Sequence, residues 1–264
     1  VLLGQRVIIK TQKGDVVGLI GAKPPHLLSP EDRKKVIEKN EMYIDIGACS
    51  KAEVEAAGVR TGDPIVPRAD FVELANGQTY LSKAFDDRVG VALTVSVLEQ
   101  LQDKQHPNTV FGVATVQEEV GLRGATTSVR AVDPHVAIVL ESDIAGDVPG
   151  IKPEESGVKL GKGPTVVIFD ARMIPNQKLR DLALKVAEEK SIPVQLSYIE
   201  GGATDGAAIH LHHTGVPTLV IGVAARHIHS HSSIIHRQDY DHAVALVSEL
   251  IQRLDAQTVA DLTA

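Results

Sequence analysis

Carboxylate and imidazole side chains recur in this sequence directly after short apolar runs. They stand at the ends of three predicted strands: Glu118 and Glu119 after 109–116, Glu141 and Asp143 after 136–140, and His227, His229 and His231 after 217–221. Asp86 and Asp87 stand in the turn before a predicted helix. Because open α/β sheets bind ligands outside the carboxyl ends of their strands, we expect these groups to meet at one edge. Oxygen and imidazole ligands without thiolate suit Zn²⁺, Mn²⁺ or Co²⁺.

Each group taken alone also has a simpler interpretation. Asp86 and Asp87 could begin a helix and complement its dipole, and the acidic groups after the strands could be solvated or capping groups. His227, His229 and His231 alternate, so in a strand they would share one face, either as ligands or as a polar stripe. Three other histidines fall on a predicted helix and are interpreted as structural or surface groups: His210, His212 and His213.

The joint occurrence of these groups at successive strand ends favours a metal site. One glutamate of the pair Glu118–Glu119 can hold a metal while its neighbour takes a proton from metal-bound water. Two metals about 3.5–4 Å apart can share one carboxylate and bind both the water and a substrate carbonyl. The pattern is therefore typical of metal-assisted hydrolysis.

Two regions differ in their predicted elements. Residues 1–80 are predicted to form a small β-rich domain, with strands at 5–11, 15–20, 43–46 and 63–66 and helices at 29–39 and 50–58. Residues 81–264 alternate predicted helices at 88–103, 121–132, 176–190, 205–213 and 239–254 with strands at 109–116, 136–140, 165–169, 194–199 and 217–221. Strands joined by helical crossovers predict an α/β sandwich around a mainly parallel sheet.

The composition excludes several classes of protein. The 264 residues are 43% hydrophobic and 23% charged, which is typical of a globular chain rather than a disordered one. No run of about 20 apolar residues predicts a transmembrane helix. The net charge of −7 argues against nucleic-acid binding, which needs clustered Lys and Arg. The single cysteine, Cys49, excludes an internal disulfide framework and favours a reducing, cytoplasmic location.

Five motifs, in their order along the chain, resemble those of the tetrahedral aminopeptidases, a family of glutamyl, leucyl and deblocking enzymes with two cocatalytic metals. They are Phe-Asp-Asp-Arg-Val-Gly (85–90), Gln-Glu-Glu-Val-Gly-Leu-Arg-Gly-Ala (117–125), Ala-Gly-Asp-Val-Pro-Gly (145–150), Gly-Gly-Ala-Thr-Asp-Gly (201–206) and Arg-His-Ile-His-Ser (226–230). Lys-Pro-Pro-His (23–26) and Ile-Asp-Ile-Gly (44–47) resemble the family's inserted β domain. The resemblance implies a three-layer α/β/α catalytic domain over 81–264 and a small inserted β-barrel-like domain over 1–80.

The resemblance implies a role for individual residues. Asp86 would bridge two divalent ions, and Glu118 would be the general base that activates the bridging water. Glu119 and His229 would be terminal ligands of one ion, and Glu141 would bind the other. The ions would be Zn²⁺ or Co²⁺, with Mn²⁺ as a further candidate.

Further residues are implied around this set. Asp143 is the rival of Glu141 as a ligand, Asp87 would orient the site, and Thr204 and Asp205 would line the substrate pocket. In the implied mechanism a metal-bound hydroxide attacks a peptide carbonyl, and Glu118 then protonates the leaving amine. The substrates would be peptides, which lose their N-terminal residue.

One motif of the family has no counterpart in this sequence. Relatives carry an upstream His-x-Asp whose histidine completes the ligands of the second ion, and nothing before Asp86 matches it. The only earlier histidine, His26, is assigned to the inserted domain, and the chain begins at Val1 rather than at Met. We therefore expect an N-terminal part of the catalytic domain to precede Val1, leaving three protein ligands for one ion and two for the other. The family also implies dimers that build a tetrahedral dodecamer through the β domain.

Two other functions stay open at this stage. The first is a non-catalytic assembly fragment of the same family, which would bind at most one metal. The second is a metal-independent glycoside hydrolase using paired carboxylates. The aromatic content of 3% and the absence of Trp argue against a groove that stacks on sugars. Metal counting together with turnover of aminoacyl-anilides would separate the aminopeptidase from the assembly fragment. Inhibition by a chelator with rescue by Zn²⁺ or Co²⁺ would rule out the glycoside hydrolase.

Overall fold

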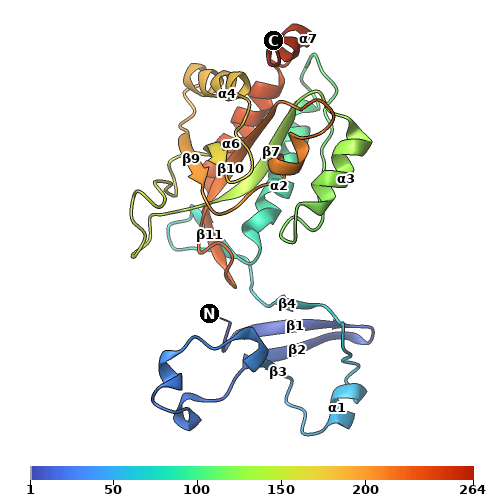
Figure 1. Ribbon diagram of the computed structural model, residues 1–264, viewed down its shortest axis with the longest axis vertical. Coiled ribbons are helices and arrows are strands. Elements are labelled where there is room, and N and C mark those ends of the chain that lie inside the picture. The colour runs from blue at the N-terminus through green and yellow to red at the C-terminus, as the bar shows by residue number, and fades with distance from the viewer. Residues whose placement is uncertain (1) are drawn as a thin grey trace. The chain divides into compact units, whose positions relative to one another are not determined.

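The chain divides into two compact units, which are coloured along the sequence in Figure 1. A computed structural model describes residues 2–264. The first unit comprises the residues up to Phe71 together with Ser230–Ser232, and the second comprises Val72–His229 and Ser233–Ala264. The predicted domain boundary at residue 80, and the separate roles of the two parts in assembly and catalysis, stay predictions.

The first unit is built on an antiparallel sheet of the order β3-β2-β1-β4. The four predicted strands all occur, as β1 (Arg6–Thr11), β2 (Gly14–Gly21), β3 (Tyr43–Asp45) and β4 (Ile65–Pro67). The predicted helix at 50–58 is α1 (Lys51–Ala56), where the Ser50 side chain accepts a hydrogen bond from the Glu53 amide. The sheet is open, so the barrel-like closure is not found. Its edge strands are three residues long, and Pro64 and Pro67 offer no N–H for further pairing.

The predicted helix at 29–39 is wrong. The segment instead holds short 3₁₀ turns, η2 (Asp32–Lys34) and η3 (Lys39–Glu41), after η1 (Pro25–Leu27). None of these turns contains a buried residue, and Val36 is 87% exposed. A short helix in water depends on burying an apolar face, and this charged segment has none.

The second unit contains a seven-stranded sheet of the order β5-β6-β11-β10-β8-β9, with β7 paired to β10. Its strands are β5 (Val72–Glu73), β6 (Thr79–Ser82), β7 (Ala137–Ile144), β8 (Thr165–Asp170), β9 (Gln195–Ile199), β10 (Thr218–Arg226) and β11 (Ser233–His236). The expected mainly parallel sheet is wrong, because only the pairs β7–β10 and β8–β9 are parallel. A parallel pair needs a long crossover, usually a helix. Here β10 and β11 are joined by a short turn, and no helix lies between β7 and β8.

Helices cover both faces of this sheet. One core packs alternate residues of β10, such as Leu219 and Ile221, with α2 (Phe85–Leu101), α4 (Gln177–Glu189) and α6 (Arg237–Ile251). On the other face Val220 packs with residues beside α3 (Arg123–Val132) and α5 (Gly206–Ile209). The last helix is α7 (Ala256–Asp261). A strand buried on both faces lies in the centre of a layered α/β fold, and β10 is that strand.

The predicted strand at 109–116 is also wrong. Within residues 2–264 this segment pairs with no strand. It lies against α2, since a Cβ at Gly112 would come within 2.5 Å of Leu98 Cδ1. Its side chains Phe111 and Val116 are exposed, which shows that apolar composition alone does not make a strand without a neighbour to pair with. No helix of the described chain has the length and apolar character needed to span a membrane.

Candidate active site

Three side chains that can bind a metal converge in the second unit from three separate segments. His229 Nε2 lies 2.9 Å from Asp86 Oδ2 and 3.7 Å from Glu119 Oε2. One ligand atom from each of the three lies within 4.8 Å of the other two. Asp86, Glu119 and His229 are called the first cluster below. Two carboxylates and one imidazole form a donor set that fits a divalent ion such as Zn²⁺.

All three residues lie where a helix begins or in a turn between regular elements. Asp86 lies in the first turn of α2 with non-helical dihedral angles (φ −84°, ψ 109°), and its peptide bond to Asp87 is cis. Glu119 lies in a tight turn before α3, in which the amides of Gly121 and Leu122 both donate to the Glu118 carbonyl. His229 lies between β10 and β11 with a left-handed φ of 58°.

A glycine allows α2 to approach β7 closely beside the first cluster. A Cβ at Gly90 would lie 2.2 Å from Asp87 Oδ2 and 2.3 Å from the Leu140 carbonyl oxygen. The Gly90 amide donates a hydrogen bond of 3.0 Å to Asp87 Oδ1. This contact orients Asp87 toward β7, where Glu141 is buried.

The buried carboxyl group of Glu141 is paired with the half-buried carboxyl group of Asp87. Burial and the neighbouring charge of Asp87 raise the pKa of Glu141 to about 10, although the Ser142 amide donates to it. Burial and the charge of Asp86 raise the pKa of Asp87 to about 8, against the lowering effect of the Gly90 amide. Acidic groups held this close would ionise readily only beside a cation. Their environment therefore fits a second divalent ion next to the first cluster.

Asp143 has different surroundings from Glu141. Its Oδ1 accepts a hydrogen bond of 2.7 Å from the Ile144 amide. Burial raises its pKa, and the hydroxyls of Ser197 and Thr165 oppose that rise. None of these groups belongs to the first cluster. The choice between Glu141 and Asp143 as a ligand stays a prediction.

Glu118 stands directly beside the first cluster. Burial raises its pKa to about 7, and the charges of Asp205, Glu119 and Asp86 add to the rise. A carboxyl group that is half protonated near neutral pH can both accept and return a proton. A role for Glu118 as the general base stays a prediction.

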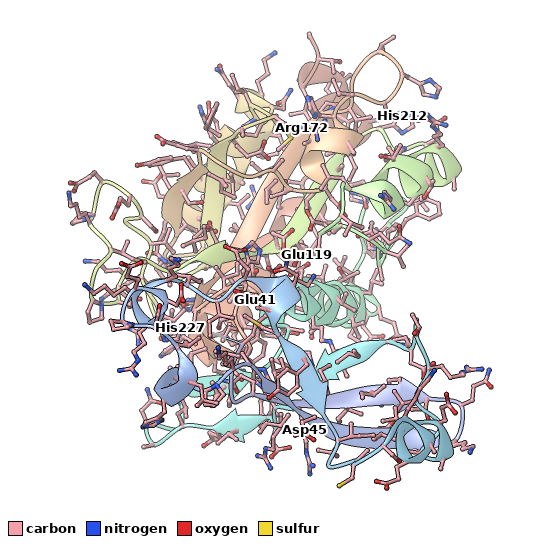
Figure 2. All side chains as sticks on the ribbon, turned by 60° about the horizontal axis from the view of Figure 1, so that its bottom comes forward. Glu41, Asp45, Glu119, Arg172, His212 and His227 are labelled. Atoms are coloured by element: carbon pink, nitrogen blue, oxygen red, sulfur yellow. The ribbon has the colours of Figure 1, made fainter. Side chains whose placement is uncertain are left out.

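Thr204 and Asp205 are buried rather than open to solvent. Asp205 Oδ2 accepts a hydrogen bond of 2.6 Å from Thr115 Oγ1, and Thr204 Oγ1 lies 3.3 Å from Asp170 Oδ2. Among the charges that raise the pKa of Glu118, that of Asp205 is the largest. A cavity of about 670 Å³ in the same unit has neither residue in its lining, which includes Arg172 and His212, both labelled in Figure 2. A role for Thr204 and Asp205 in a substrate pocket stays a prediction.

The alternating histidines do not share one face. Residues 227–232 form turns and bends instead of a strand, and of the three histidines only His229 belongs to the first cluster. His231 Nε2 lies 3.4 Å from the Arg68 carbonyl oxygen in the first unit. The expected helix 205–213 ends early, at Ile209, and His210 Nδ1 lies 2.9 Å from the Gly206 carbonyl oxygen.

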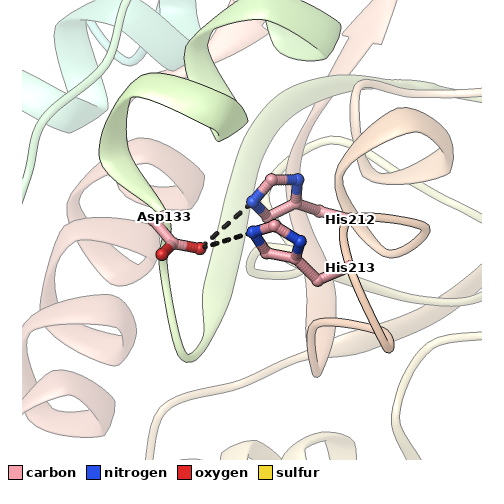
Figure 3. Close-up of side chains that lie close together, drawn as sticks. All are labelled: Asp133, His212 and His213. Atoms are coloured by element: carbon pink, nitrogen blue, oxygen red, sulfur yellow. Dashed lines mark hydrogen bonds and ion pairs between the residues drawn. The ribbon is translucent and has the colours of Figure 1, made fainter.

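A second group of metal-binding side chains was not predicted. His212 Nε2 and His213 Nε2 lie 3.1 Å and 3.3 Å from the same oxygen, Asp133 Oδ1 (Figure 3). Asp133, His212 and His213 are called the second cluster below. Asp133 and His212 are 79 positions apart, and the sequence around Asp133 shows only an ordinary helix end. The adjacent histidines were the only signal available.

Comparisons with known proteins identify the family of this chain. A family model described as M42 glutamyl aminopeptidase matches residues 1–246. The glutamyl aminopeptidase of Lactococcus lactis subsp. cremoris is 35% identical over 264 residues, covering 99% of this chain and 73% of that relative.

Similar solved structures include TET peptidases. The TET aminopeptidase of the marine sediment archaeon Thaumarchaeota archaeon SCGC AB-539-E09 is 52% identical with a TM-score of 0.97, over 99% of this chain and 74% of that one. The TET1 peptidase of Pyrococcus horikoshii, which can assemble into a tetrahedron or a large octahedral shell, is 34% identical with a TM-score of 0.84, over 96% of this chain and 73% of that one. The chain therefore belongs to the M42 glutamyl aminopeptidase family, whose members are metallopeptidases that hydrolyse peptide bonds.

Proposed function

We propose that this protein removes N-terminal residues from peptides at a two-metal centre, with Glu118 as the general base. The observation that carries the proposal is the position of Glu118, a half-buried carboxyl group with a pKa near 7 beside three converging metal donors. Membership of an aminopeptidase family favours this reaction over hydrolysis of a glycosidic bond.

The residues present would hold two divalent ions as follows. The first cluster would bind one ion, and Asp86 would be shared with a second ion that Glu141 also binds. Asp87 would keep the carboxyl groups in place, because it lies between them and is fixed by the Gly90 amide. When bound, the ions would polarise the peptide carbonyl and make water a better nucleophile at neutral pH.

Glu118 would move the proton in this reaction. It accepts the proton of the attacking water and delivers it to the amine that leaves when the peptide bond breaks. Burial, together with the negative charge of Asp205, keeps the pKa of Glu118 high enough for the second transfer. Thr115 positions Asp205 by its hydrogen bond to Oδ2.

We also propose that the protein works as a homo-oligomer. The support is its 34% identity to a TET1 peptidase that assembles into a tetrahedron or an octahedral shell. The unit that ends at Phe71, with its open sheet edges, is the part we expect to contribute to assembly. Light scattering on the purified chain would test this, and a monomer at all concentrations would contradict it.

The catalytic proposal is tested by metal removal and by substrate design. The chelator-treated protein should lose turnover of aminoacyl-anilides and of short peptides, and Zn²⁺ or Co²⁺ should restore it. The products of peptide turnover should be the N-terminal residue and the shortened peptide, since the proposed reaction removes one residue from that end. Turnover that survives metal removal would contradict the metal-dependent mechanism. A metal-saturated chain without turnover would support the alternative of an inactive assembly fragment.

A further inference from the structure

The second cluster brings three metal donors together outside the proposed catalytic centre. Asp133 is the residue that ends α3, and His212 and His213 lie in the turn that follows α5. Both Nε2 atoms point at one carboxylate oxygen, at 3.1 Å and 3.3 Å (Figure 3). One ligand atom of each residue lies within 4.8 Å of the other two.

These separations match a tetrahedral ion. Ligand atoms bound at about 2.0–2.2 Å to a tetrahedral ion lie about 3.3–3.6 Å from one another. The two nitrogen–oxygen distances of the second cluster are within a few tenths of an ångström of that range. Small movements of exposed side chains would bring the donors onto one ion.

The backbone holds this arrangement in advance of any ligand. Asp133 and His213 adopt left-handed φ angles of 52° and 50°, which non-glycine residues rarely adopt. The His212 side chain is only 9% exposed, and its ring lies 3.9 Å from that of His213, between ring centres. Because His212 is held by its surroundings, binding an ion would cost less side-chain entropy than it would with three freely rotating donors.

We propose that Asp133, His212 and His213 bind one tetrahedral transition-metal ion, Zn²⁺ in the first instance, at a site separate from the catalytic centre. Two imidazoles and a carboxylate suit Zn²⁺, and they do not suit Mg²⁺ or Ca²⁺, which prefer oxygen ligands. The bound ion would link the end of α3 to the turn after α5. These segments are 79 positions apart in sequence.

The fourth ligand position is the point at which this site meets other molecules. His212 and His213 also line the cavity of about 670 Å³, together with Arg130 and Arg172. An ion at the second cluster would carry water or a small anion in its fourth position, and the two guanidinium groups favour an anion.

The test counts metal ions in three forms of the full chain. The unchanged protein, His213→Asn and His135→Asn are stripped with a chelator, dialysed against Zn²⁺ and analysed for zinc per chain. His135 is the matched control, since it is an exposed histidine two positions from Asp133 that belongs to neither cluster. We expect His213→Asn to bind one ion fewer than the other two forms, with aminopeptidase turnover unchanged. His213 is 69% exposed, so the substitution should leave the fold intact, which the melting temperature of the metal-free forms checks.

Co²⁺ provides a second readout of the same proposal. Tetrahedral Co²⁺ absorbs visible light far more strongly than octahedral Co²⁺, so the absorption reports the geometry of the site directly. The His229→Asn form, which has an impaired first cluster, should keep a tetrahedral Co²⁺ band, and adding His213→Asn should remove it. Equal zinc contents in His213→Asn and His135→Asn, or a band that survives the double substitution, would overturn the proposal.

Discussion

The first and second clusters are donor sets of equal size in opposite electrostatic surroundings. The first has two carboxylates and one imidazole, and the carboxyl groups of Glu118, Asp87 and Glu141 surround it. The second has one carboxylate and two imidazoles, and it borders a cavity lined by Arg130 and Arg172. Each cluster offers three donors that could bind one ion, but only the first cluster has further acidic groups beside it.

We expect these additional acidic groups to distinguish the proposed catalytic site from the proposed binding site. Buried carboxyl groups with raised pKa values destabilise the metal-free protein, and divalent ions relieve the cost when they bind. The same crowding raises the pKa of Glu118 into the range where a base is useful. The second cluster has no such group of additional carboxyls beside it. The free energy of binding an ion there would therefore come only from its three donors.

The largest expected effect comes from Glu118→Gln, which removes the base and keeps the shape of the side chain. Loss of a general base typically costs about 10²–10⁴-fold in rate, so kcat for an aminoacyl-anilide should fall by that factor. The number of bound metal ions should not change, because Glu118 is not a proposed ligand. The control is Glu99→Gln, an exposed glutamate on α2, which should leave kcat unchanged. If the Glu118→Gln protein kept nearly full kcat, Glu118 would not be the general base, and the proposed difference between the first and second clusters would be wrong.

The next largest effect is expected when a histidine of each cluster is replaced, in His229→Asn and in His213→Asn. Removing a group that hydrogen-bonds to a metal ligand typically lowers the metal affinity about 10–100-fold. Removing the ligand itself, in His229→Asn, should therefore lower the Zn²⁺ affinity by more than about 100-fold. Turnover at limiting Zn²⁺ should fall with it. His213→Asn should leave turnover unchanged, because His213 is not among the proposed catalytic residues. Titration of metal-free protein with Zn²⁺, followed by activity, measures both variants. If both substitutions lower turnover equally, the two sites are not independent.

The sequence predicted the first cluster better than the fold around it. The acidic groups Asp86, Glu118 and Glu119 were found because each follows or precedes a regular element, and such ends meet at one edge of a sheet. The strand at 109–116 that was expected to carry the glutamates does not exist, because no neighbouring strand pairs with it. The glutamates reach the cluster through the tight turn before α3 instead.

Long-range contacts explain what the sequence could not predict. The second cluster depends on the packing that brings the end of α3 to the turn after α5, and no local pattern encodes that contact. The mixed direction of the sheet has the same origin, since β11 returns beside β10 through a turn that resembled a histidine-rich strand. The spacing of apolar residues indicates which face of a segment is buried. It does not indicate which distant segment packs against that face.

A third prediction concerns the pH dependence of stability in the metal-free protein. The pKa of Glu141 rises from its ordinary 4.5 to about 10 in the fold, so the folded protein holds a proton that the unfolded chain has lost. Stability is therefore full below the ordinary value and falls as the pH rises toward the folded value, by up to about 1.4 kcal/mol per pH unit. Glu141→Gln cannot ionise, so it should unfold at a higher urea concentration than the unchanged protein at pH 8.

The advantage of Glu141→Gln should shrink when both metal-free proteins are unfolded at pH 5. Added Zn²⁺ should reverse the order at pH 8, since the unchanged protein regains its ligand and the variant does not. Urea unfolding of Asp133→Asn serves as the comparison from the second cluster, and because this variant keeps Glu141, its stability should fall with pH as that of the unchanged protein does. An equal pH slope for the unchanged protein and Glu141→Gln would mean that Glu141 is ionised in the metal-free fold.

The smallest effect is expected at the ion pair that ends β10, three residues before His229. Arg226 donates through Nε and Nη2 to Asp147, at 2.9 Å and 2.6 Å, and holds the pKa of that carboxyl below its usual value. Because the Arg226 side chain is 34% exposed, Asp147→Asn should cost at most about 1 kcal/mol at pH 7 in urea unfolding. A lowered pKa stabilises the fold above the ordinary value, so this cost should vanish as the pH falls through the folded pKa. Asp181→Asn breaks the exposed pair with Arg180 and should cost less. If Asp147→Asn also weakens Zn²⁺ binding at the first cluster but not at the second, the end of β10 positions His229.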